Sequence, residues 1–292
     1  MDVISLFDPW SDPLCSCPVK YSLNPYTGCS HGCIYCYISS YIPRAFESRP
    51  KKDLLRRVER DIRKIDRLPI SMSNSSDPYP PIENDSQLTR GVLEILKRHR
   101  HPLLIVTKSD LVARDTDLLR EMDAVVMITI TTLKSVHMKT EPGAPSPKRR
   151  LNAMNALSEA GIPVGMRLDP IIPGLFSDYL ELIESASSAG ASHVVASTFK
   201  PRPDGWNRFK KTFSKLSNDL LPLYFEEGEI RKSSRYLPEE LRRQILSGVK
   251  CEVEKRGLTF STCREGIFKD ETASCDGSHM LKNDAPIEFE SL

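Results

Sequence analysis

The chain has 292 residues, 39% of them hydrophobic and 27% charged, and its formal net charge is +2. These values are typical of a globular protein with one large domain, or one domain with an appendage. The small net charge gives no argument by itself for a polyanionic partner. The N-terminal MDVISLFDPWSDP lacks the pattern of a signal peptide, and no apolar stretch approaches the roughly 18 residues that span a bilayer. We therefore expect a cytoplasmic protein with no membrane partner.

Short apolar strands alternate with helical patterns from residue 21 to residue 200. The expected strands are residues 21–26, 70–74, 102–107, 124–130, 162–168 and 191–198, and the helical patterns cover 86–99, a segment from Asp115, 146–161 and 177–190. Such βα units form a parallel sheet, so the fold class is α/β. Six units give an open doubly wound sheet or a partial barrel, and both bind ligands at the carboxyl ends of their strands. Polar residues stand at those ends: Ser75 to Asp77, Lys108, residues 129–132, and Asp169 with Pro170.

The pattern changes after residue 200. Residues 201–206 (PRPDGW) are expected to form a loop, and residues 207–250 to be helical with breaks near Gly228 and Pro238. Residues 258–262 are typical of one more strand, and the tail from Lys282 is expected to fray. The predicted organisation is an N-terminal extension at 1–20, an α/β domain at 21–200 and a largely helical C-terminal extension at 201–292.

Residues 44–67 carry ten Lys and Arg against five Asp and Glu. A solvated helix face with ion pairs four residues apart is the favoured interpretation, and a nucleic-acid patch is the alternative.

Five of the eight cysteines lie between residues 15 and 36. A long chain without an export signal is more typical of metal or redox chemistry than of a disulfide framework. Cys29, Cys33 and Cys36 have the spacing C-x3-C-x2-C, which suits thiolates that converge on an iron–sulfur cluster. Gly28 and Gly32 let the loop curl.

Three cysteines leave one coordination position open, as a catalytic metal site requires. Two alternatives remain for this loop: a zinc site with His31 as the fourth ligand, and three buried apolar cysteines.

The loop NPYTGCSHGCIYCY, with an aromatic residue before its last cysteine, resembles the signature of the radical SAM superfamily. A closer resemblance is to the spore photoproduct lyase family, whose SplB-like relatives are also labelled DNA repair photolyases. It spans about residues 20–200 and rests also on SNSSDPYPPIE, VTKSDLVARDTDLL, MKTEPGAPSPKRRLNAMNAL and DPIIPGL. The resemblance implies a partial (β/α)6 TIM-like barrel, a 4Fe-4S cluster on the three cysteines, and a reductant such as flavodoxin or ferredoxin. It also implies reductive cleavage of S-adenosylmethionine (SAM) to a 5′-deoxyadenosyl radical.

Residue roles are implied where the sequence matches the family. Tyr35 and Tyr37 match catalytic tyrosines, and Ser76, Lys108 and Thr129 match SAM-binding positions. Glu141 and Arg150 match family positions without an assigned role. Asn74 stands where the lyase has a cysteine that returns a hydrogen atom, which an asparagine cannot do. Splitting of a thymine dimer by the lyase's mechanism is therefore not expected.

The other cysteines allow a second site. Cys15, Cys17, Cys263 and Cys275 could meet as an auxiliary cluster or a zinc site, with His279 as a further candidate ligand. Alternatively, Cys263 or Cys275 is the missing hydrogen donor, or all four are ordinary thiols. Cys251 lies in a helical pattern and is expected in the core.

Three functional hypotheses follow. The first is a radical SAM enzyme that acts on nucleic acid, a nucleotide or another macromolecule, and the second is the same chemistry on a small metabolite or peptide. The third is a non-catalytic cluster or zinc protein that binds nucleic acid through residues 44–67.

Overall fold

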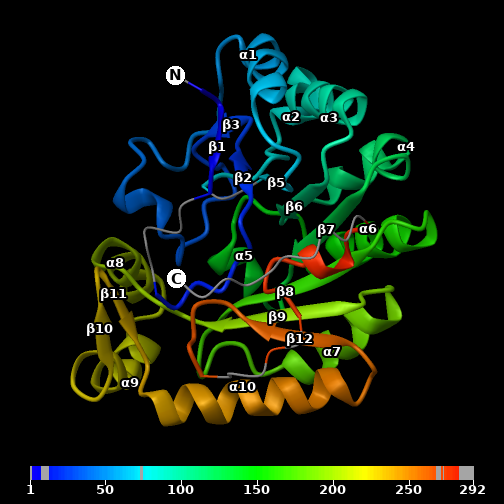
Figure 1. The fold of residues 1–292 in the computed structure, drawn as a ribbon. Coiled ribbons are helices and arrows are strands. Elements are labelled where there is room, and N and C mark those ends of the chain that lie inside the picture. Colours follow the sequence, from blue (N-terminus) through cyan, green and yellow to red (C-terminus); the bar gives the residue numbers. More distant parts are fainter. Residues whose placement is uncertain (1, 8–12, 73–74, 268–270, 272, 283–292) are drawn as a thin grey trace.

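A curled sheet of eight strands forms the centre of the molecule in the computed structural model, which describes residues 2–7, 13–72, 75–267, 271 and 273–282 (Figure 1). The strand order is β1-β2-β5-β6-β7-β8-β9-β12, parallel except for the antiparallel pair β1-β2. The sheet does not close, so β1 and β12 are its two edges. Its strands are β1 Ile4–Leu6, β2 Tyr21–Leu23, β5 Ile70–Met72, β6 Leu103–Thr107, β7 Ala124–Thr129, β8 Val164–Ile171, β9 His193–Thr198 and β12 Thr259–Thr262.

Helices follow the strands in the expected rhythm. They are α1 Leu54–Asp61, α2 Glu83–Ser86, α3 Leu88–His99, α4 Thr116–Leu119, α5 His137–Thr140, α6 Pro147–Glu159, α7 Tyr179–Ser188, α8 Pro203–Thr212, α9 Ser214–Phe225 and α10 Glu239–Glu254. Helix α6 begins as its sequence predicts, because Ser146 accepts a hydrogen bond from the Arg149 N–H and Pro147 occupies the first turn. The parallel α/β fold of six units is thus confirmed, and the expected strand at 258–262 extends the same sheet as β12. No helix among the described residues is long and apolar enough to cross a membrane.

The two faces of the sheet have different partners. Alternate residues along a strand point to opposite faces, so Leu103 and Ile105 join the core under the helices while Leu104 joins a separate inner cluster. That inner cluster contains Leu104, Val125, Met127, Val195 and Cys275. The C-terminal stretch, red in Figure 1, thus packs on the inner face of the sheet.

Several local expectations are wrong. Residues 201–206 are not a simple loop, because α8 already begins at Pro203, a residue whose fixed φ favours a first helical turn. Cys251 is exposed on α10 rather than buried in the core. The expected strand 21–26 is two short strands, β2 and β3 Tyr26–Thr27, of which β3 pairs with β4 Arg49–Pro50.

Residues 207–250 are expected to be helical with breaks near Gly228 and Pro238, but the stretch between those two residues is a hairpin of β10 Glu229–Arg231 and β11 Ser234–Tyr236. The domain boundaries at 20 and 200 stay a prediction, and strands from both extensions join the central sheet.

The basic segment forms a solvated helix face. Helix α1 buries Leu54 and Val58, and Glu59 makes an ion pair with Arg63, 2.8 Å away and four residues along the chain. These features agree with the favoured interpretation of residues 44–67, and the nucleic-acid alternative stays a prediction.

Candidate functional site

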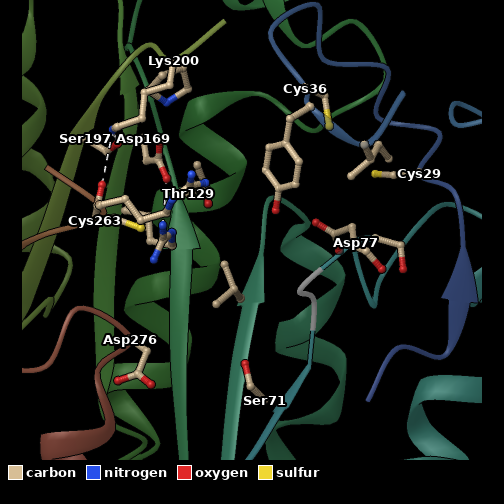
Figure 2. Close-up of a pocket in the computed structure, with 18 of the residues that line it drawn as sticks. Cys29, Cys36, Ser71, Asp77, Thr129, Asp169, Ser197, Lys200, Cys263 and Asp276 are labelled. Atoms are coloured by element: carbon tan, nitrogen blue, oxygen red, sulfur yellow. Dashed lines mark hydrogen bonds and ion pairs between the residues drawn. The ribbon is translucent and has the colours of Figure 1, made fainter. Parts of the chain in front are cut away.

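A cavity of about 570 Å³ opens at the carboxyl ends of the parallel strands. Figure 2 shows Cys29 and Cys36 on one side of it, and Cys263, Asp169, Ser197 and Lys200 on the other. Of the metal, cofactor and catalytic candidates named from the sequence, all but His279 line the cavity: Cys15, Cys17, Cys29, His31, Cys33, Tyr35, Cys36, Tyr37, Ser76, Lys108, Thr129, Cys263 and Cys275. Residues up to 260 positions apart in the sequence thus line one cavity.

Hydrogen bonds to the backbone of the three-cysteine loop hold it in place from two directions. The Cys29 N–H donates to Ala45 O at 2.7 Å, and Arg208 on α8 donates to Cys36 O at 2.6 Å. Gly28 has φ +77°, and a Cβ on it would lie 2.3 Å from Glu47 O. The loop therefore needs glycine at this position both for its conformation and for its close approach to residues 44–47.

In this structure the environment of the three loop thiols favours their protonated form. Burial, with smaller contributions from neighbours, raises the pKa of Cys29 to about 12, and burial raises the pKa of Cys33 and of Cys36 above the usual value. Lys108 opposes this shift at Cys33 and Cys36, because its ammonium group favours thiolate. A bound cation would have to displace the protons of these thiols.

His31 does not serve as a fourth ligand in this conformation. Its Nδ1 lies 3.1 Å from Gly143 O, and its Nε2 lies 3.2 Å from a carboxylate oxygen of Asp77. Both ring nitrogens are therefore engaged within the protein. Of the two alternatives for the loop, the zinc site completed by His31 is not supported.

Asp77 connects the cysteine loop with the end of β6. Its carboxylate accepts hydrogen bonds from the Lys108 N–H at 2.8 Å and from Thr107 Oγ1 at 2.7 Å, besides its contact with His31. Burial disfavours its charge, but these partners prevail and lower the pKa of Asp77 to about 2. A fixed negative charge thus orients both the loop and the Lys108 backbone.

The three predicted SAM-binding side chains lie at neighbouring strand ends. Ser76 follows β5 and donates to Tyr26 O at 2.8 Å, Lys108 follows β6, and Thr129 ends β7. Figure 2 shows Thr129 on a strand in the middle of the cavity. Asn74, at the position of the missing hydrogen donor, lies outside the described residues.

Tyr35 is positioned by a buried ion pair. Its hydroxyl donates to Glu141, whose carboxylate faces Arg150 Nη2 at 2.5 Å, and both charged side chains are fully buried. Burial opposes the charge of Glu141, but Arg150 and then Lys108 lower its pKa to about 2. Tyr37, in contrast, is 39% exposed, and its ring stacks on that of Tyr41 with 6.2 Å between the ring centroids. Glu141 and Arg150 therefore support Tyr35 without lining the cavity themselves.

Besides Asp169, the far wall of the cavity carries two charged residues that the sequence did not single out, Arg167 and Lys200. Arg167 in β8 lies 2.7 Å from Asp169 Oδ2, and Lys200 after β9 lies 2.6 Å from Glu265 Oε1. Ser197 on the same wall accepts a hydrogen bond from the Lys200 ammonium group (Figure 2). The signal that could have found Arg167 is a charge within an otherwise apolar strand, VGMRLDPI.

The second group of cysteines also comes together. Cys17 Sγ lies 3.3 Å from Cys275 Sγ, and the thiols of Cys15 and Cys263 contact Cys17 and Cys275 respectively. His279 is turned to other partners: Ser274 Oγ at 3.0 Å and Thr259 Oγ1 at 3.2 Å. Both of its ring nitrogens therefore have partners outside the cysteine group.

Comparison with known proteins gives consistent matches. The family model described as the radical SAM superfamily matches residues 23–186, more than half of the chain. An uncharacterized protein of Methanocaldococcus jannaschii is 36% identical over 164 residues, 53% of this chain and 62% of that protein, so the chain spans less than two thirds of this relative. An uncharacterized protein of Mycobacterium tuberculosis is 26% identical over 247 residues, 78% of this chain and 72% of that protein.

Solved structures share the fold. A mutant of spore photoproduct lyase with bound AdoMet and dinucleoside spore photoproduct has a TM-score of 0.65 at 19% identity, covering 82% of this chain and 75% of that chain. Streptococcus suis SuiB bound to S-adenosylmethionine has a TM-score of 0.52 at 15% identity, covering 85% of this chain and 51% of that chain. At these identities the likeness concerns the architecture, a partial barrel.

Proposed function

The chain belongs to the radical SAM superfamily and is an enzyme, and from this premise we propose that Cys29, Cys33 and Cys36 hold its 4Fe-4S cluster and that it cleaves SAM reductively to a 5′-deoxyadenosyl radical. One observation carries the proposal: the three thiols share a single cavity with Ser76, Lys108 and Thr129 at the carboxyl ends of the strands. The non-catalytic hypothesis is set aside, because the family is one of enzymes.

The residues present fit the cluster. Three cysteine thiols form the donor set, Gly28 makes the close turn that a Cβ would prevent, and His31 is engaged elsewhere. The cluster, when bound, supplies the electron for SAM cleavage at an iron that the protein leaves open. Lys108 adds a positive charge beside Cys33 and Cys36, which favours their thiolate forms.

The remaining side chains orient SAM and shield the reaction. The hydroxyls of Ser76 and Thr129 and the ammonium of Lys108 offer hydrogen bonds and a charge for a polar, zwitterionic ligand. Tyr35 is fixed by Glu141 and can keep its position beside Lys108, whose Nζ lies 5.6 Å from the ring centroid. Tyr37 is more exposed and is the better candidate to meet the substrate.

We favour nucleic acid as the substrate class. The basic segment begins against the cysteine loop, because Cys29 N–H donates to Ala45 O and Ser30 N–H to Ser48 Oγ. Arg44, whose side chain is 67% exposed and lies 3.4 Å from Glu47, is next to Ala45 and so brings a basic residue close to the cysteine loop. Phosphate contacts of this kind would give binding that weakens steeply with salt.

A binding experiment separates nucleic acid from the alternative of a small metabolite or peptide. Fluorescence anisotropy with single- and double-stranded DNA and RNA should show steeply salt-dependent binding that Arg44→Glu with Arg56→Glu weakens several-fold. Lys255→Glu, an exposed change after α10, is the control and should have little effect. No binding at low salt would favour the alternative.

The first test of the activity uses protein purified and reconstituted without oxygen. Wild type should hold about four irons in the cluster and, with dithionite or a flavodoxin or ferredoxin as reductant, release 5′-deoxyadenosine from SAM. Cys33→Ala should lose both the iron and the product, whereas Cys251→Ala, at an exposed thiol, should keep both. Iron and visible absorbance that survive in Cys33→Ala would contradict the proposal.

A further inference from the structure

Four cysteines from the two ends of the chain form a continuous group of thiols. Cys17 Sγ lies 3.3 Å from Cys275 Sγ, Cys15 contacts Cys17, and Cys263 contacts Cys275. Cys275 is buried and the other three are half-buried. All four line the cavity, but they belong to segments apart from the C-x3-C-x2-C loop.

Hydrogen bonding alone gives little reason for four thiols to meet. A thiol is a weak donor and a weak acceptor, so these contacts stabilise the fold far less than a metal bound by four thiolates does. From this arrangement we infer that Cys15, Cys17, Cys263 and Cys275 bind one zinc ion as a structural site. The inference does not rest on the function proposed above.

The spacing favours a single ion over a second iron–sulfur cube. Tetrahedral Zn–S bonds of about 2.3 Å place neighbouring sulfurs about 3.8 Å apart, close to the 3.3 Å between Cys17 and Cys275. A cube binds each thiolate to a different iron and holds the four sulfurs well beyond contact distance. The thiols form a chain of contacts, and no three His, Cys, Asp or Glu side chains of the described residues already converge on one point. Rotation of the side chains must complete the tetrahedron.

Nearby charges suit the expected product. A zinc ion with four thiolates carries a net charge of −2, which is costly in a buried site unless cations lie close. Lys20 and Arg167 both lie within reach, since each interacts with a cysteine of the group, Lys20 with Cys17 and Arg167 with Cys263. Lys20 is also paired with Asp276, next to Cys275.

The location gives the site a structural purpose. Cys15 and Cys17 precede β2, near one edge of the open sheet, and Cys263 follows β12, the other edge. Cys275 lies on the inner face against Val125, Met127 and Val195. A metal shared by these residues would fasten the two edges of the sheet to each other across the mouth that the barrel leaves open.

The test measures metals directly in the full-length protein. Anaerobically purified wild type, supplied with zinc and iron, should hold about one zinc besides its iron, and zinc K-edge absorption should show four sulfur neighbours at about 2.3 Å. Cys17→Ser and Cys275→Ser should each lower zinc content at least several-fold and keep the iron, whereas Cys33→Ser should do the reverse. Cys251→Ser is the matched control and should keep both metals.

Three results would overturn the inference. One is wild-type protein without zinc; another is zinc that persists in both Cys17→Ser and Cys275→Ser. The third is about eight irons in wild type, falling to about four in Cys275→Ser, which would identify an auxiliary cluster in place of zinc. Because the absorption spectrum is taken on wild type, a variant that fails to fold does not leave the inference untested. A variant that loses zinc but still forms 5′-deoxyadenosine, or one that keeps zinc but forms none, separates this site from the proposed activity.

Discussion

Single residues near the cysteine loop are fixed by charge. Asp77 and Glu141 are both buried carboxylates that stay ionised because cationic or N–H partners face them. Asp77 holds His31 and the Lys108 backbone, and Glu141 holds Tyr35. These side chains act on the site by orienting its members.

Replacement of Glu141 by Gln should be strongly destabilising. It leaves the Arg150 guanidinium, which is fully buried, without its negative partner. We expect a loss of about 3–5 kcal/mol in the free energy of unfolding, measured by urea denaturation of the cluster-free protein. Glu240→Gln on the exposed face of α10 should change it by about 0.5 kcal/mol at most. Equal effects of the two substitutions would contradict the assignment of Glu141.

The same carboxylates predict an acid dependence. The folded pKa of about 2 for Glu141 and Asp77 lies below the ordinary values of 4.5 and 3.8, so the unfolded chain takes up protons first as the pH falls. Their stabilisation is therefore complete above about pH 4.5 and is lost as the pH falls toward about 2. Urea midpoints of the cluster-free protein should fall over this range. Glu141→Gln should show a flatter dependence there, and an unchanged slope would count against the pKa shift of Glu141.

At the scale of elements, the cysteine loop depends on its fit against residues 44–47. Gly28 and Gly161 have the same φ of +77°, but only Gly28 has a backbone oxygen where a Cβ would go. Alanine substitutions at these two glycines therefore separate the free-energy cost of a left-handed backbone from the cost of a steric clash.

Gly161→Ala should therefore cost only about 1–2 kcal/mol of stability and leave iron binding unchanged. Gly28→Ala has the same conformational cost, and its Cβ would also clash with Glu47 O. It should therefore lower the iron content per chain at least several-fold. Iron and sulfide analysis after reconstitution is the measurement. Full iron occupancy in Gly28→Ala would show that the loop adjusts, contrary to its role as a fixed cradle.

At the scale of the whole molecule, a segment from the N-terminal part of the chain meets one from the C-terminal part on the inner face of an open sheet. The buried pair of Lys20, just before β2, and Asp276, in the C-terminal stretch, connects them. This connection spans more than 250 residues and lies beside the four-cysteine group.

Breaking that pair should destabilise the protein more than breaking a surface pair. Lys20→Met leaves Asp276 buried without its cation, so we expect a loss of about 3–5 kcal/mol. Arg243→Met, which removes the exposed ion pair with Glu239, should cost about 0–1 kcal/mol. In a double-mutant cycle, Lys20→Met with Asp276→Asn should lose less than the sum of the single losses. Additive losses would mean that the two residues do not interact.

The sequence alone determined the βα rhythm and the parallel sheet, and it carried the prediction of a cluster site at the C-x3-C-x2-C loop. Strand and helix periodicity are local properties, and the three cysteines of the loop lie within eight residues, so neither prediction needed a distant contact. The placement of the polar residues at strand ends followed from the same rule, because a parallel sheet gathers its carboxyl ends at one edge.

Only the tertiary structure decided the partners of distant residues. The ring nitrogens of His31 face Gly143 and Asp77, which are both more than 40 residues away along the chain. Cys251 faces solvent because α10 packs through Leu246, Val249 and Val253. The meeting of Cys17 with Cys275 depends on how the open sheet curls and where the C-terminal stretch crosses its inner face. Such contacts arise from packing over long separations, for which a single sequence carries no periodic signal.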